Sequence, residues 1–221
     1  MEKLIEKLQN EAKRFLASTK LVWNNVVILP KEIEVYYYKK GKFEDDSVHR
    51  NELQKNNKNH FYVHRWGETK NDKYKGGNRA GLDLVVSDEE NTYHSYLIRS
   101  AVINGDMVIG PNKVLKTICP NLSYNELENK PVELISEKSS CDVLFSERIN
   151  LNQELESAHY ELRIVLCDDL YLESKYPLKG KMIINFLVDK LKRQEIDKEQ
   201  ALQYAKNKLG YIPSEIKNFV L

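Results

Sequence analysis

The sequence predicts an α+β fold, a single domain with a curved, largely antiparallel sheet flanked by helices and followed by C-terminal helices. Segments rich in β-forming residues fill the middle of the chain, and helical periodicity is strongest at its two ends. Short turn signals such as Asn104-Gly105 join neighbouring strands, which is typical of antiparallel pairing. We expect residues 1–180 to form this α+β domain and residues 181–221 to be a helical extension packed on the same domain.

The N-terminal part predicts one helix and two strands. Residues 2–17 place apolar side chains on one helical face, and residues 22–29 and 32–38 are extended segments separated by Pro30. Further strands are expected at residues 60–65, 81–87, 93–103, from 107 onward, 131–135, 141–145 and 160–167. Helices are expected at residues 47–57 with Ser47 as the cap, 113–118 after Gly110-Pro111-Asn112, 181–194, 197–208 and 214–220.

Composition excludes several classes of protein. The 221 residues are 41% hydrophobic, so the chain can bury a core and is not disordered as a whole. No run approaches the roughly 20 apolar residues that span a bilayer, and the first 20 residues lack the apolar centre of a secretory signal. The cysteines Cys119, Cys141 and Cys167 are far apart, so we expect no disulfides and a cytoplasmic protein.

Charge is unevenly distributed although the net charge is only +1. Residues 31–80 hold 12 basic and 8 acidic residues, a net of +4, whereas residues 121–180 hold 6 basic and 12 acidic residues, a net of −6. The basic segment is interleaved with aromatic residues, a pattern that suits phosphate contacts and base stacking. Ordinary surface variation explains the same numbers equally well.

Several common sites are missing from the sequence. It has no GxGxxG, no phosphate-binding GxxxxGK[ST], no GxSxG and no HExxH. His60 and His64 are four residues apart on a predicted strand, without an obvious third metal ligand. We therefore expect neither a metal nor a cofactor.

Four short motifs occur in a fixed order: I-E-V-Y at residues 33–36, E-D-D-S-V-H at 44–49, Y-L-I-R-S-A at 96–101 and G-P-N-K-V-L at 110–115. Through them the sequence resembles the alkyladenine (3-methyladenine) DNA glycosylase family, with its E-T-E-A-Y strand, acidic loop ending in histidine, L-L-R-A strand and G-P-x-K-L helix start. The resemblance covers roughly residues 25–150, and Ser146–Asn150 and Tyr176-Pro177-Leu178 extend it toward later segments. It implies a monofunctional enzyme that flips a damaged purine out of double-stranded DNA and hydrolyses its bond to the sugar.

The resemblance assigns roles to individual residues. Glu34 matches the general base that activates water, and Arg99 matches the arginine that helps to hold this water. Tyr36 and His49 match residues that flank the flipped base. Lys113 matches the lysine of G-P-x-K, close to phosphate, and Arg50 is a further candidate for DNA binding.

The sequence departs from the family at three positions. His64 stands where the family has a third base-stacking tyrosine, and Asp83 stands where it has an asparagine that screens bases. The tyrosine that wedges into the duplex is missing, and Trp66 is a candidate substitute.

Each candidate has an ordinary structural interpretation. Glu34 also fits a solvated glutamate at a strand edge, and Arg99 also fits a structural salt bridge. His49 also fits an ordinary loop histidine, and Tyr36 an ordinary strand aromatic. For His64 and Trp66 a structural role is favoured over a functional one. Three functions therefore stay open: a monomeric glycosylase, a non-catalytic nucleic-acid-binding or regulatory module on the same scaffold, and a protein-interaction domain using residues 121–180 and the C-terminal helices.

Overall fold

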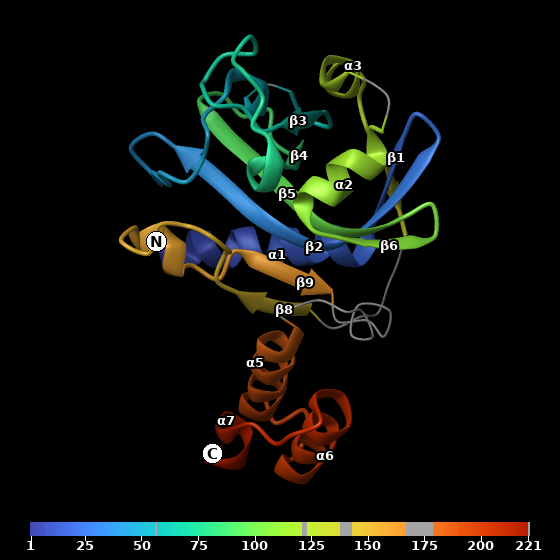
Figure 1. The fold of residues 1–221 in the computed structure, drawn as a ribbon. Coiled ribbons are helices and arrows are strands. Elements are labelled where there is room, and N and C mark those ends of the chain that lie inside the picture. The colour runs from blue at the N-terminus through green and yellow to red at the C-terminus, as the bar shows by residue number, and fades with distance from the viewer. Residues whose placement is uncertain (56, 121–122, 138–142, 167–178, 221) are drawn as a thin grey trace. The chain divides into compact units, whose positions relative to one another are not determined.

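The computed structural model describes residues 1–221 except residues 56, 121–122, 138–142, 167–178 and 221. The chain divides into two compact units, Met1–Cys167 and Asp168–Leu221. The first unit is an α+β domain built on one antiparallel sheet, as the sequence predicts (Figure 1). Whether the C-terminal helices pack on this domain stays a prediction.

All strands of the sheet pair antiparallel with their neighbours, mostly in the order β3-β4-β5-β2-β1-β7. Strand β6 pairs with β5, and β9 lies between β2 and β8. The described strands are β1 (Thr19–Trp23), β2 (Val26–Lys39), β3 (Phe61–Val63), β4 (Leu82–Val85), β5 (Thr92–Ile103), β6 (Asp106–Ile109), β7 (Glu133–Ser136), β8 (Val143–Ser146) and β9 (Arg163–Leu166).

Strands β2 and β5 form the centre of the sheet, and helices cover both of its faces (Figure 1). Helix α1 (Glu2–Ser18) packs on one face through Leu8, Ala12 and Phe15, and the Phe15 ring lies 4.9 Å from that of Tyr96 on β5. Helix α2 (Pro111–Ile118) packs on the opposite face. Because side chains alternate along a strand, every second residue of β2 points to the face of the sheet away from α1, where its side chain can contribute to a site.

The prediction of two strands separated by Pro30 is wrong. Strand β2 runs through Pro30, because a register shift between Pro30 and Glu32 accommodates the missing N–H of proline. The chain reverses instead at Asn24-Asn25, whose φ angles of 49° and 68° form a two-residue hairpin turn.

Two other elements differ from expectation. The helix expected at residues 47–57 is a single 3₁₀ turn, Glu52–Gln54, and its cap is Asn51; Ser47 bonds to Asp45 instead. The short helix α3 (Tyr124–Asn129) was not predicted, although Ser123 and Glu126 form a capping box at its start. Two further 3₁₀ turns lie at Gly77–Arg79 and Glu156–His159.

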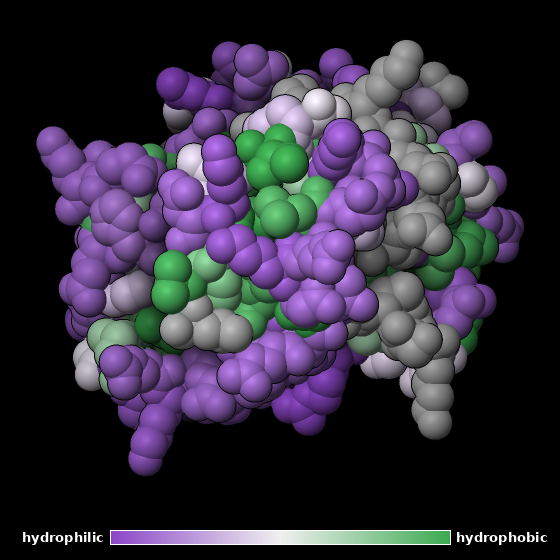
Figure 2. Space-filling view, turned by 90° about the horizontal axis from the view of Figure 1, so that it is seen from below, coloured by the Kyte–Doolittle hydropathy of each residue, from purple (hydrophilic) through white to green (hydrophobic). Residues whose placement is uncertain are grey.

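In the part of the second unit that the structure describes, three helices follow the predicted pattern: α5 (Lys179–Lys192), α6 (Lys198–Leu209) and α7 (Ser214–Lys217). Asp197 caps α6, and Gly210 ends it with a φ of 78°. The face of the molecule in Figure 2 is mainly hydrophilic, with hydrophobic residues in small separate areas, which is common on protein surfaces.

Candidate functional site

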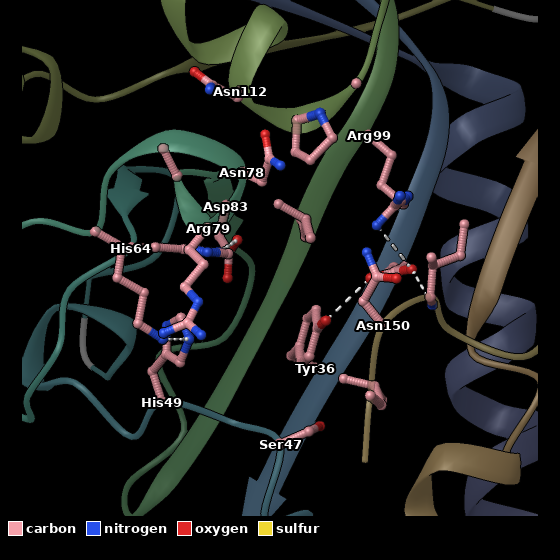
Figure 3. Close-up of a pocket in the computed structure, with 18 of the residues that line it drawn as sticks. Tyr36, Ser47, His49, His64, Asn78, Arg79, Asp83, Arg99, Asn112 and Asn150 are labelled. Atoms are coloured by element: carbon pink, nitrogen blue, oxygen red, sulfur yellow. Dashed lines mark hydrogen bonds and ion pairs between the residues drawn. The ribbon is translucent and has the colours of Figure 1, made fainter. Parts of the chain in front are cut away.

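A pocket of about 480 Å³ opens between the centre of the sheet, the start of α2 and three loops. This volume lies in the range of small-molecule binding sites. Seven of the residues proposed from the sequence line it: Glu34, Tyr36, His49, His64, Asp83, Arg99 and Lys113. In the view of Figure 3 the histidines and Asp83 lie on one side, Arg99 and Asn150 on the other, and Tyr36 between them.

Glu34 is fully buried on β2, so its interpretation as a solvated edge residue is wrong. Its Oε1 accepts a hydrogen bond from the Ile149 backbone N–H at 2.7 Å and forms an ion pair with Arg99 Nη1 at 3.1 Å. Its Oε2 accepts from the Tyr36 hydroxyl at 3.0 Å. A carboxylate has about four acceptor positions, so these three partners leave room for one more, such as water.

Arg99 is both part of an ion-pair network and part of the pocket. Its Nε lies 3.1 Å from Oε1 of Glu32, which is fully buried. Glu32 also accepts from Arg163 Nε at 2.6 Å and from the Ser100 hydroxyl at 2.7 Å. Sequence reasoning missed Glu32 and Arg163, although Arg163, like Arg99, is an arginine inside an apolar strand segment. This network fixes the guanidinium that faces Glu34.

Arg148 lies over one face of the Tyr36 ring, with its guanidinium carbon 4.9 Å from the ring centre. Arg148 is fully buried and pairs with Asp45 at 2.6 Å, within the acidic loop that the sequence singled out. Burial and the neighbouring Glu34 charge raise the pKa of Tyr36 well above its usual value, so its hydroxyl remains a donor. The ring therefore offers one fixed face and one fixed hydroxyl to the pocket.

His49 lies between two polar partners. Its Nδ1 is 3.2 Å from the Tyr62 hydroxyl oxygen, and its Nε2 is 2.7 Å from Lys75 Nζ. Burial, followed by the nearby His64 and Lys75, lowers the pKa of His49 to about 3. The imidazole is therefore neutral at physiological pH. Its ring meets that of His64 edge to face at a centroid distance of 4.5 Å.

Asp83 is buried and satisfied by three donors. It accepts from His64 Nε2 at 2.7 Å, from the Ser95 hydroxyl at 2.7 Å and from Gln54 Nε2 at 3.2 Å. Burial opposes the charged carboxylate, but His64 and the hydrogen bonds prevail and lower the pKa of Asp83. A side chain at Gly81 would come within 2.7 Å of the His64 ring, so this pairing requires glycine there.

The three residues proposed to bind DNA lie in different places. Lys113 lines the pocket. Trp66 is 56% exposed and does not line it, but Lys75 and Arg79, which do, lie over its ring at 5.2 and 5.1 Å. Arg50 lies outside the pocket, 5.3 Å over the Tyr38 ring and paired with Glu68. Sequence reasoning flagged the polar loop at residues 67–80 but did not select Lys75 or Arg79 within it.

Asn112 connects this loop to α2, since its side-chain amide donates to the Gly77 carbonyl at 2.7 Å. The segment Tyr176-Pro177-Leu178 lies outside the described residues, as do Cys141 and Cys167, while Cys119 is buried with its Sγ 3.9 Å from the Ser123 carbonyl oxygen. Within the described part of the chain, no three His, Cys, Asp or Glu side chains are arranged to hold a metal ion, and no helix is long and apolar enough to cross a membrane.

No model of a known protein family matches the chain, and no curated protein matches it significantly.

Proposed function

We propose that the chain is a DNA glycosylase that hydrolyses the N-glycosidic bond of alkylated or deaminated purines. The observation that carries this proposal is the buried Glu34 carboxylate, paired with Arg99 at 3.1 Å and facing a pocket with aromatic and histidine walls. Four of the residues that line the pocket, Glu34, His49, Arg99 and Lys113, come from the four separate motifs of the sequence. The order of these motifs along the chain is that of the glycosylase motifs. We further propose that the enzyme acts as a cytoplasmic monomer on double-stranded DNA.

In this reaction Glu34 is the general base. A water molecule at the remaining acceptor position of the carboxylate gives up a proton as it attacks C1′ of the sugar. The electron pair of the C1′–N bond leaves with the purine. Arg99 holds the carboxylate in place and orients the water, because its own position is fixed by Glu32.

The rest of the pocket suits an extruded purine. Tyr36 provides a ring face for stacking, and the edge-to-face rings of His49 and His64 form the opposite wall (Figure 3). Extruding a base costs a few kcal/mol, which stacking and phosphate contacts must offset. Lys113 and Arg79 line the same pocket and are exposed, so they are placed to contact phosphates.

The test is base release from duplexes that each carry hypoxanthine, ethenoadenine or 3-methyladenine. Wild type is expected to convert at least one of them to an abasic site. Glu34→Gln should lower the rate by about 10²- to 10⁴-fold, the usual contribution of a general base. Glu133→Gln is the matched control, because Glu133 is an exposed glutamate on β7 of the same sheet. Equal rates for wild type and Glu34→Gln would refute the assigned mechanism.

A second candidate is a non-catalytic nucleic-acid-binding or regulatory module. The observation that favours it is that the Glu34 and Asp83 carboxylates already have three polar partners each. Glu34 has two hydrogen-bond donors and the Arg99 ion pair, and Asp83 has three hydrogen-bond partners. This candidate predicts salt-dependent DNA binding without base release. A protein-interaction domain, the third possibility, predicts no DNA binding even at low salt.

A further inference from the structure

Lys75 occupies a position in the pocket that base hydrolysis by Glu34 does not use. It lies in the loop between β3 and β4, and its backbone N–H donates to the His64 carbonyl at 2.8 Å. Its Nζ lies 2.7 Å from His49 Nε2. The lysine is therefore anchored at its backbone and at its amine, so both ends of its flexible four-carbon chain have a partner.

The surroundings of Lys75 favour the neutral amine. The side chain is half-buried, and Arg79 lies over the same Trp66 ring as Lys75. Burial, followed by the charge of Arg79, lowers the pKa of Lys75. Only the neutral amine is a nucleophile, and desolvation beside a second cation is a known way of activating lysine.

Lys75 also has a base beside it, and that base is oriented by a third group. His49 is neutral at physiological pH, so its Nε2 can accept a hydrogen bond from the amine and can take a proton from the nitrogen once attack has made it positively charged. Its Nδ1 faces the Tyr62 oxygen, which in turn accepts from the Arg65 backbone N–H at 3.2 Å. A nucleophile, a base within hydrogen-bond distance and a group that orients the base together form the arrangement of covalent catalysis. A lysine that only binds phosphate needs no such partners.

We propose that Lys75 is a nucleophile that forms an imine with the ring-opened sugar of an abasic site and thereby cuts the DNA strand. The choice of sugar rests on the proposed function, because an abasic site is the product of base release in this pocket. Departure of the purine vacates part of the pocket that Lys75 lines. The resemblance implies a monofunctional enzyme, so this activity is additional to it.

The chemistry balances with water as the only further reactant. The Lys75 amine forms a bond to the C1′ aldehyde carbon, the carbonyl electron pair goes to oxygen, which takes a proton from solvent water, and the nitrogen loses a proton to His49 Nε2. That proton returns to the hydroxyl, which leaves as water and gives the protonated imine. His49 then takes the C2′ proton, the C3′–O bond breaks, and the 3′-phosphate leaves with the electron pair. Hydrolysis of the imine restores the lysine.

Borohydride trapping tests this proposal directly, because it reduces the imine to a stable covalent adduct. One arm uses a duplex with a preformed abasic site, so that no base release is needed. The other arm uses 2-deoxyribose 5-phosphate, which requires no DNA binding. Wild type and the control Lys73→Ala, which removes an exposed lysine of the same loop, are expected to give adducts in both arms.

Lys75→Arg should lose the adduct in both arms while its thermal unfolding matches wild type, because a guanidinium has a similar length but forms no imine. Peptide mapping should place the wild-type adduct on residue 75. An undiminished adduct in Lys75→Arg, an adduct mapped to another lysine, or no adduct in either arm would overturn the proposal. An adduct with the sugar phosphate alone would support the nucleophile and refute the DNA substrate. If the lesion assay shows no base release, the role proposed for Glu34 is refuted. The Lys75 proposal is still tested separately, because both trapping arms start from a sugar that has already lost its base.

Discussion

The Tyr36 hydroxyl is the donor to Glu34 that can be removed with the smallest change of shape. Tyr36→Phe keeps the ring in the pocket but deletes the 3.0 Å hydrogen bond. A hydrogen bond to a charged group contributes about 1.5 kcal/mol, so single-turnover base release should slow by about tenfold. DNA binding should be unchanged, which a gel-shift titration measures. Tyr38→Phe, outside the pocket, is the control; equal slowing in both variants would contradict this role.

The alternation of side chains along β2 was enough to predict that Glu34 and Tyr36 share a face. The partners of Glu34 could not be predicted, because Ile149 is 115 residues away and reaches it through a loop. The same holds for Glu32 and Arg163, which meet only because β9 pairs with β2. A single sequence contains no signal for such a register.

Helix α3 contacts the end of β3 through a buried ion pair between Arg65 and Glu128. Arg65 and Glu128 are 2% and 4% exposed; the two guanidinium nitrogens of Arg65 reach the two Glu128 oxygens, and Glu128 also accepts from the Val63 N–H at 2.8 Å. Removing one partner leaves a buried charge unpaired. Glu128→Gln should therefore lower the free energy of unfolding by about 3 to 5 kcal/mol, measured by urea denaturation.

The double variant Arg65→Met/Glu128→Leu separates pairing from packing, because it removes both charges and keeps apolar volume. It should recover most of the lost stability. A double variant as unstable as Glu128→Gln would show that α3 depends on something other than the charge balance.

Elements with strong periodicity or clear caps were predicted well, and elements set by tertiary contacts were not. The apolar stripe of α1 was sufficient to predict that helix. The Asp197 cap and the terminating Gly210 were sufficient to predict where α6 begins and ends. The helix expected from Ser47 onward did not form, because Ser47 bonds to Asp45 and Asn51 caps a short 3₁₀ turn instead. Pro30 was misread because the bulge that tolerates it depends on the pairing of β2 with β5.

Acid should destabilise the first unit, and His94 provides the clearest contribution. The side chain is 7% exposed between Tyr37 and Tyr96, and burial lowers its pKa to about 4 from the usual 6.5. Below pH 6.5 the unfolded chain binds a proton that the folded protein does not, so stability falls as the pH falls toward 4. The expected loss from this residue is about 3 kcal/mol at pH 4.

His94→Phe removes the titrating group and keeps an aromatic ring. Urea denaturation of both proteins at pH 7 and pH 4 measures the effect. The variant should lose about 3 kcal/mol less than wild type between the two pH values. Parallel losses would mean that His94 is not responsible.

At the scale of the whole molecule, a net charge of +1 predicts modest and strongly salt-dependent affinity for DNA. The cations at the pocket, such as Lys113 and Arg79, supply the attraction, and the acidic segment at residues 121–180 opposes it. Lys113→Ala should weaken binding to all sequences alike and reduce the slope of log K against log salt by about 1. Fluorescence anisotropy over a salt series measures this slope; an unchanged slope would remove Lys113 from the DNA interface.

The glycosylase proposal is tested most directly by the single-turnover rate of base release, with free purine and abasic site measured on the same lesion panel for wild type and Glu34→Gln. The proposal predicts equal amounts of purine and abasic site from at least one lesion with wild type. It also predicts a rate about 10²- to 10⁴-fold lower for Glu34→Gln, with DNA binding retained. DNA binding by wild type without release of any base, or release at the same rate by Glu34→Gln, would contradict it.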